Sequence, residues 1–330
     1  MTLAQREQLV AQGYYALDRN ENLDPTLKAR ISRLLASAPG NIATTYADYP
    51  ALHSKLCNFF KVNEDQLILT NGCTEAIRIG FNWGVRSMLF LTPTYPGATD
   101  YALQQANTIM HYLPDRTPFK AVLKYVRDHR IDFVYLCNPN NPSGSVYGLE
   151  ELDQIRKSPA MFFIDEAYYD FCGVSAVGLN LKNVLIAKSF SKAWGLAGLR
   201  LGALIGPADT LASLSPLKLK ASISSVGVYC LSQMLDHGDW VLSSINKIMK
   251  GDTYMRSLLL SRGYRVYNDP HVNFIWSDIP STTLHQLKVL HKTVAGSTCI
   301  TLAPTGIMRD IFSHGLPSKP RTSLFISVSG

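Results

Sequence analysis

Lys192 is the side chain whose surroundings most clearly indicate chemistry. It lies in the segment 187–200 (AKSFSKAWGLAGLR), at the end of an apolar run. A lysine in a loop is usually a solvated charge, but Ser189, Ser191 and Arg200 place two hydroxyls and a guanidinium nearby, which suits a phosphate dianion. An amine beside such a phosphate site can form a Schiff base with a phosphorylated aldehyde. The segment therefore predicts covalent chemistry at Lys192.

A carboxylate at the end of a second apolar run supplies a matching group. Asp165 follows the run 161–164 (MFFI), and Tyr168 comes three residues later. Asp165 could simply cap a helix. A buried carboxylate is otherwise costly without a cationic partner, and a protonated pyridine nitrogen would be such a partner. Tyr168 is placed to reach the same ring.

Three turns after other apolar runs add polar and aromatic groups. The turn 137–144 (CNPNNPSG) would present Asn141, and the turn 92–97 (TPTYPG) would present Tyr95 for stacking on a planar ring. The turn 70–75 (TNGCTE) opens a helix, so the N–H groups of Cys73 and Thr74 suit a phosphate. Each turn alone is a weak signal, because such residues more often serve a turn or the core.

The elements that must position these residues are short, almost continuously apolar strands alternating with helical stretches. Strands of this kind are covered on both faces, which predicts an α/β fold with a mostly parallel sheet and the loops at one edge. The expected strands span residues 66–70, 87–91, 131–137, 161–164, 184–187 and 201–205.

The chain beyond about residue 208 has a different pattern. A long helical stretch over 224–262, with a break near Gly238, precedes short strands and a helix over 283–293, which predicts a smaller α+β domain. We expect a large domain over 41–225, and a small domain formed by 1–40 and 226–330. The expected strands of the small domain span 264–267, 273–277, 297–302 and 324–328.

Composition excludes several classes of protein. The 330 residues are 46% hydrophobic and 17% charged, which excludes a largely disordered chain, and no apolar run approaches the roughly 18 residues of a membrane helix. The net charge of +7 comes from scattered cations, so we expect an anionic small molecule as partner and no nucleic acid. The six cysteines form no CxxC pair, so we expect no metal site and a reducing compartment. The N-terminus lacks the apolar core of a secretory signal, and the expected location is cytoplasmic.

Taken together, the motifs resemble those of fold-type I pyridoxal-phosphate enzymes of the class I/II aminotransferase group. The similarity is greatest to the histidinol-phosphate aminotransferase branch, which includes threonine-phosphate decarboxylases. The segments that carry it are 18–22 (DRNEN), Tyr49-Pro50, 138–144 (NPNNPSG), 165–171 (DEAYYDF) and 189–202 (SFSKAWGLAGLRLG). The resemblance implies an aminotransferase that moves an amino group from an amino acid or amino alcohol phosphate to a 2-oxo acid.

Position by position, the resemblance implies a pyridoxal phosphate site. Lys192 would hold the cofactor as a Schiff base and act as acid and base, with Asp165 beneath the ring nitrogen. Tyr49 would reach the cofactor phosphate of a neighbouring subunit, which implies a homodimer with shared sites. The other implied cofactor residues are Cys73, Thr74, Ser189, Ser191 and Arg200 at the phosphate, Asn141 and Tyr168 at the ring hydroxyl, and Tyr95 on the ring face.

The substrate end of the site departs from the family. The implied substrate residues are Asn20 and Arg309, but Phe325 stands where the family's last strand carries a carboxylate-binding arginine, and Arg321 lies four residues away. A decarboxylase, or a lyase or cyclase with the same cofactor, is therefore an open alternative. A non-catalytic regulator that binds the cofactor is a further one, disfavoured because the resemblance already begins near residue 15.

Overall fold

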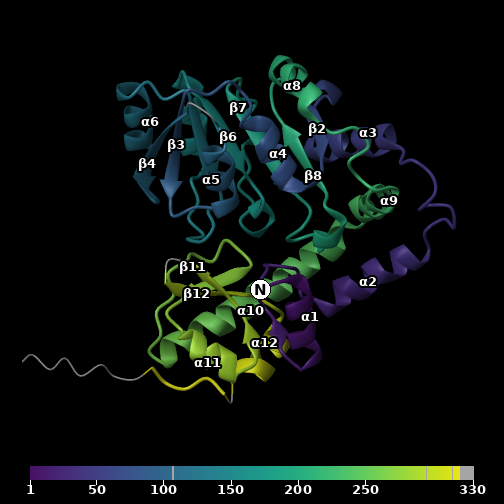
Figure 1. The fold of residues 1–330 in the computed structure, drawn as a ribbon, viewed down its shortest axis with the longest axis vertical. Helices are drawn as coiled ribbons and strands as arrows, with labels where there is room; N and C mark the ends of the chain where they lie inside the picture. Colours follow the sequence, from purple (N-terminus) through teal and green to yellow (C-terminus); the bar gives the residue numbers. More distant parts are fainter. Residues whose placement is uncertain (106–107, 295, 314, 320–330) are drawn as a thin grey trace, which may run out of the picture.

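A seven-stranded sheet forms the larger layer of the protein (Figure 1). The computed structural model describes residues 1–105, 108–294, 296–313 and 315–319. The strands are, from one edge to the other, β2 (Leu67–Thr70), β8 (Gly202–Ile205), β7 (Val184–Ser189), β6 (Met161–Asp165), β5 (Phe133–Cys137), β3 (Ser87–Thr92) and β4 (Ile109–Pro114).

The strand directions bring many loops to one edge of this sheet. Strands β7, β6, β5, β3 and β4 are parallel, and β8 runs antiparallel to both β7 and β2. The carboxyl ends of β2, β3, β5, β6 and β7 and the amino end of β8 therefore share an edge, where α/β proteins bind ligands. The predicted α/β class with a mostly parallel sheet is confirmed.

Helices cover both faces of the sheet. The side chains of β5 show why, because Phe133 and Tyr135 pack into one hydrophobic cluster and Val134 and Leu136 into the other. One face carries α4 (Gly72–Gly80), α5 (Pro96–Leu103) and α8 (Ala208–Leu214), and the other carries α3 (Tyr49–Phe60), α6 (Phe119–Asp128) and α7 (Leu149–Asp153). Short 3-10 helices span Glu64–Gln66, Gln154–Lys157, Tyr169–Phe171, Ala176–Leu179, Ala197–Leu199, Ser215–Leu217 and Leu235–His237.

A smaller layer faces the loop edge of the large sheet (Figure 1). The predicted long helix is confirmed together with its break, which is the 3-10 turn immediately before Gly238. A three-stranded antiparallel sheet, in the order β11-β12-β9, and a parallel pair of β1 with β10 complete this layer. Its elements are α1 (Leu3–Ala11), β1 (Tyr15–Ala16), α2 (Pro25–Ala36), α9 (Ser225–Met234), α10 (Gly238–Ser261), β9 (Phe274–Ser277), α11 (Ser281–Gln286), β10 (Val289–Leu290), β11 (Lys292–Val294), β12 (Ser297–Thr301) and α12 (Thr305–Phe312).

The sequence predictions are wrong at three places. Strand β4 was not predicted, and the expected strand over 264–267 is reduced to a single bridge between Val266 and Ser277. The helix expected over 283–293 ends at Gln286, and strands β10 and β11 follow. The strand expected over 324–328 lies outside the described residues.

Two further observations concern the chain as a whole. None of the six cysteines forms a disulfide. Among the described residues, no helix combines the length and the apolar character that crossing a bilayer requires.

The sheet edge that carries the loops is tightly packed around Gly202. A Cβ atom on Gly202 would lie 2.6 Å from the Gly72 carbonyl carbon, 2.8 Å from the Lys188 carbonyl oxygen and 2.9 Å from the Cys73 amide nitrogen. These are backbone atoms of α4 and β7, so they can move only with their elements. We expect Gly202→Ala to lower the free energy of unfolding by about 1–3 kcal/mol in urea denaturation. Gly198→Ala is the control, since a Cβ there meets nothing within 4 Å, and equal losses in the two variants would contradict this account.

Candidate active site

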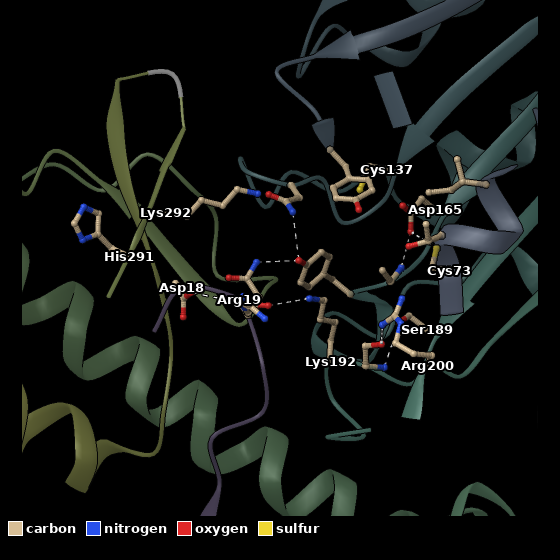
Figure 2. A pocket seen from close by; sticks show the side chains of 18 of the residues that line it. Asp18, Arg19, Cys73, Cys137, Asp165, Ser189, Lys192, Arg200, His291 and Lys292 are labelled. Carbon is tan, nitrogen blue, oxygen red and sulfur yellow. Dashed lines mark hydrogen bonds and ion pairs between the residues drawn. The ribbon is translucent and has the colours of Figure 1, made fainter. Parts of the chain in front are cut away.

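A cavity of about 570 Å³ lies between the loop edge of the large sheet and the smaller layer. Eleven of the thirteen residues predicted for the site line it, which is the main result of the structure for function. They are Asn20, Cys73, Thr74, Tyr95, Asn141, Asp165, Tyr168, Ser189, Ser191, Lys192 and Arg200. They come from the N-terminal arm (residues 1–40) and from segments next to β2, β3, β5, β6, β7 and β8. Figure 2 labels ten of the residues that line the cavity.

Asp165 is the buried acid of the cavity. It is the last residue of β6 and only 3% exposed. Its Oδ1 accepts hydrogen bonds from the Ala167 amide (3.0 Å) and the Cys73 thiol (3.2 Å), and its Oδ2 accepts one from the Tyr135 hydroxyl (2.8 Å). Burial raises the pKa of Asp165, while these hydrogen bonds act in the opposite direction. A carboxylate at the wall of a cavity, with no ion pair to a described residue, fits a protonated ring nitrogen.

Lys192 lies on the loop after β7 with its amine in the same cavity (Figure 2). Nζ donates to the Arg19 carbonyl oxygen at 3.2 Å and lies 5.7 Å from the centre of the Tyr168 ring. Burial lowers the pKa of Lys192 to about 8, and the nearby Arg200 and Lys292 add to this effect against Glu21 and Asp165. A large fraction of the amine is therefore neutral near pH 8 and able to act as a nucleophile or a base.

The Tyr168 hydroxyl links the N-terminal segment to the loop after β5. It accepts hydrogen bonds from the side-chain amides of Asn141 (3.3 Å) and Asn20 (3.0 Å). Its ring packs edge-on against Phe274 of the small sheet, with 5.5 Å between ring centres. Tyr95 immediately precedes α5 and lines the same cavity, and its predicted stacking on a cofactor ring stays a prediction.

The residues predicted to bind phosphate converge at the N-terminus of α4. Arg200 donates to the Ser191 hydroxyl at 3.3 Å, and the Ser191 amide donates to the Ser189 hydroxyl at 3.2 Å. Gly72 has φ +72°, a backbone conformation that favours glycine, and without a Cβ it leaves room for Arg200 Nη2, which lies 2.6 Å from where that atom would be. No side chain caps α4, so the free N–H groups of its first turn remain available to an anion. Two hydroxyls, a guanidinium and a helix N-terminus together fit a phosphate.

Two predicted residues are not brought to the cavity. The Tyr49 hydroxyl is hydrogen-bonded to the carbonyl and the amide of Ile223, so its role toward a partner subunit stays a prediction. Arg309 is exposed on α12, with its guanidinium 5.9 Å from the Tyr254 ring. Its predicted contact with substrate stays a prediction without support from this geometry. Phe325 and Arg321 lie outside the described residues.

The structure adds basic side chains that the sequence did not indicate. Arg19, His291 and Lys292 line the cavity on the side of the N-terminal arm and the small sheet. Arg19 Nε lies 3.6 Å from Asp18, and the Arg19 side chain is 43% exposed. Arg19 was within a recognised motif, whereas the region of Lys292 was predicted to be helical and gave no signal.

A buried ion pair lies behind the Lys192 loop. Lys188 of β7 is 1% exposed and pairs with Glu166, which is fully buried. Lys188 Nζ also donates to the Ser175 hydroxyl at 2.9 Å and lies 3.3 Å from the centre of the Tyr169 ring. Glu166 accepts a further hydrogen bond from the Ala176 amide at 2.7 Å. These contacts satisfy both charges and tie the strand that precedes Lys192 to the loop that follows Asp165.

The sequence is similar to those of known aminotransferases. A family model described as "Aminotransferase class I and II" matches residues 9–300. Histidinol-phosphate aminotransferase from Thermotoga sp. (strain RQ2) is 34% identical over 272 residues, covering 80% of this chain and 78% of that protein. Histidinol-phosphate aminotransferase 1 from Legionella pneumophila (strain Lens) is 29% identical over 211 residues, covering 60% of this chain. That match spans only 58% of the Legionella protein.

A solved structure supports the same fold. The crystal structure of histidinol-phosphate aminotransferase from Sinorhizobium meliloti in complex with pyridoxal-5'-phosphate superposes with a TM-score of 0.80. The match covers 94% of this chain and 93% of that chain at 20% sequence identity. At this identity the similarity demonstrates the fold, and the residues of the cavity carry the chemical argument.

The buried ion pair gives a prediction about stability. We expect Lys188→Met to lower the free energy of unfolding by about 3–5 kcal/mol, because it leaves the Glu166 charge buried without a partner. The double variant Lys188→Met/Glu166→Leu removes both charges, so we expect it to be more stable than Lys188→Met alone. Urea denaturation measures both, and Lys124→Met, which breaks an exposed pair with Asp128, is the control. A double variant that is no more stable than the single one would contradict the account.

The lowered pKa of Lys192 gives a prediction about reactivity. Only the neutral amine attacks an aldehyde, so the rate at which the apoprotein bonds to pyridoxal phosphate should rise with pH through a midpoint near 8. Stopped-flow absorbance measures this rate, and Lys192→Ala should abolish the signal. A midpoint near 10, the value of a solvated lysine, would show that the amine is not buried as described.

Proposed function

The chain belongs to the class I and II aminotransferases, and from that premise we propose that it is a pyridoxal-phosphate-dependent aminotransferase of the histidinol-phosphate type. It would transfer an amino group from an amino acid or amino alcohol phosphate to a 2-oxo acid. The proposal rests on one observation: Lys192, Asp165 and the phosphate-binding groups at the N-terminus of α4 line the same cavity. The bound cofactor supplies an electron sink for carbanion chemistry.

Each cavity residue has a role in this reaction that its position supports. Asp165 would hold the proton on the ring nitrogen, and Asn141 and Tyr168 would bind the ring hydroxyl. Lys192 would bind the cofactor until substrate replaces it, and would then move a proton at the substrate α-carbon as a base and acid. Tyr95 would stack on the ring. The phosphate ligands would be the backbone amides of Cys73 and Thr74, together with Ser189, Ser191 and Arg200.

The substrate would be anionic. Arg19 and Lys292 lie on the side of the cavity opposite Asp165 and Arg200 (Figure 2), and Asn20, which follows Arg19 in the chain, donates to the Tyr168 hydroxyl. An arginine and a lysine facing the amine site would attract a phosphate or carboxylate on the substrate. The predicted loss of an arginine at Phe325 therefore does not leave the cavity without positive charge.

We propose that the active form is a cytoplasmic homodimer. Tyr49 is held by Ile223 away from the cavity of its own chain, which supports a role toward a partner subunit. The six free thiols are in keeping with a reducing compartment. The division into a large domain over 41–225 and a small domain over the remainder is part of the same proposal.

A single-turnover experiment tests the function. Mixing the holoenzyme with candidate amines should convert bound cofactor to pyridoxamine phosphate, which absorbs at shorter wavelength. Carbon dioxide release with retained pyridoxal phosphate would instead favour the decarboxylase alternative. Formation of neither pyridoxamine phosphate nor carbon dioxide with any amine would contradict both.

The two cavity cations give a quantitative prediction. We expect the variant Arg19→Ala/Lys292→Ala to raise KM for phosphorylated amines by about tenfold or more, because charged hydrogen bonds contribute about 1.5–3 kcal/mol each. Its KM for neutral amines should change little. Lys250→Ala, which removes an exposed cation of α10, is the control. Equal effects on charged and neutral amines would contradict the proposed substrate site.

A further inference from the structure

Cys73 and Tyr135 both contact Asp165, and neither contact belongs to the proposed reaction. The sequence predicts that the backbone amide of Cys73 binds phosphate, and the Cys73 thiol in addition donates to Asp165 Oδ1 at 3.2 Å. Tyr135 lies on β5, the strand next to β6, and donates to Asp165 Oδ2 at 2.8 Å. Each carboxylate oxygen therefore has its own side-chain donor. The Ala167 amide adds a third hydrogen bond, to Oδ1, from the loop after β6.

Burial keeps Tyr135 and Cys73 protonated, so both act as hydrogen-bond donors to Asp165. Tyr135 is 1% exposed within the aromatic core beside Phe81 and Phe163. Burial and the nearby Asp165 charge raise the pKa of the Tyr135 phenol and of the Cys73 thiol well above their ordinary values. Both groups therefore keep their protons, and toward an ionised Asp165 they act only as donors.

Asp165 depends on these donors because little else compensates its charge. The titratable groups that face it from the packed elements are Cys73 of α4, Tyr95 before α5, Tyr135 and Cys137 of β5, Tyr168 after β6 and Lys192 after β7. Lys192 is the one cation among them, and its own amine is partly neutral near pH 8. Hydrogen bonds to the charged form of a carboxylate are the remaining means of keeping it ionised at a buried position.

We propose that Cys73 and Tyr135 are positioning residues that keep Asp165 ionised and fix the plane of its carboxylate toward the cavity. This inference rests on the proposed function, because it gives Asp165 the ring nitrogen of pyridoxal phosphate as its partner. A protonated Asp165 cannot pair with a protonated ring nitrogen. The two donors would thus set the lowest pH at which the protein binds its cofactor tightly.

The test follows cofactor affinity across pH. The dissociation constant of pyridoxal phosphate is measured for the apoprotein by absorbance titration at a series of pH values. In the wild type, affinity falls on acidification as Asp165 takes up a proton. Removing a donor raises the pKa of Asp165, so the fall should begin at higher pH in Tyr135→Phe and in Cys73→Ala, by about one pH unit each. Titration of the cofactor's own phosphate is common to all variants and cancels in the comparison.

Two matched controls separate positioning from packing. Cys73→Ser keeps a donor at the same position and should behave as the wild type. Tyr147→Phe removes another buried hydroxyl, which donates to the Thr117 carbonyl at 2.6 Å outside the cavity, and should leave the midpoint unchanged. Circular dichroism verifies that each variant is folded.

The outcomes are distinct. Unshifted midpoints in both donor variants, or equal shifts in Cys73→Ser and Cys73→Ala, would overturn the positioning role while leaving the proposed function intact. A wild-type protein that does not bind pyridoxal phosphate at any pH would overturn the proposed function itself. If Tyr135→Phe fails to fold, the comparison of Cys73→Ala with Cys73→Ser decides alone.

Discussion

A carboxylate stays ionised inside a protein only when its surroundings replace the water that it has lost, and Asp165 imposes this constraint on the whole site. The residue ends a strand in the middle of a sheet that is covered on both faces. Its neighbours in three elements therefore have to supply hydrogen-bond donors: α4 supplies Cys73, β5 supplies Tyr135, and the loop after β6 supplies an amide. Gly202 of β8 has no Cβ that would meet the backbone of Gly72 and Cys73, so the start of α4 can lie against the sheet edge.

The alternation of side chains along strands separates two sets of charges. Asp165 and Ser189 point into the cavity, and the residues next to them in sequence, Glu166 and Lys188, point behind it. Because β6 and β7 are parallel neighbours, with Asp165 opposite Ala187, the two rear charges meet as an ion pair. The rear pair is complete in itself, so it neither competes for the cavity groups nor exposes a free charge to them.

The sequence predicts the large sheet well because its strands are apolar and buried on both faces. Strand β4 escaped prediction because it is an edge strand whose side chains are exposed or half-buried, so it lacks a continuous apolar run. Leu284, Leu287 and Leu290 are spaced three residues apart, which is compatible with the helix expected over 283–293. The chain instead turns at Lys288, which has φ +54°, and pairs Val289 and Leu290 with β1. That pairing joins residues 274 positions apart in the sequence (Tyr15 with Val289), and periodicity cannot reveal it.

The same distinction explains why the side of the cavity proposed to hold the cofactor could be predicted from the sequence, whereas the side proposed to hold the substrate could not. Every cofactor residue that reaches the cavity lies within a few residues of the end of a strand in one sheet, so strand order alone brings these residues together. The cations of the substrate side come from the N-terminal arm and from β11, which meet only after the smaller layer packs across the sheet edge. Cross-strand pairing places Lys292 opposite Cys299 of β12. Two residues further along β12, the Thr301 hydroxyl accepts a hydrogen bond from the backbone amide of Asn20 at 2.8 Å. Under the proposed function, substrate preference would depend on how the small sheet and the arm pack together, and a change in either would alter it without disturbing the residues predicted to hold the cofactor.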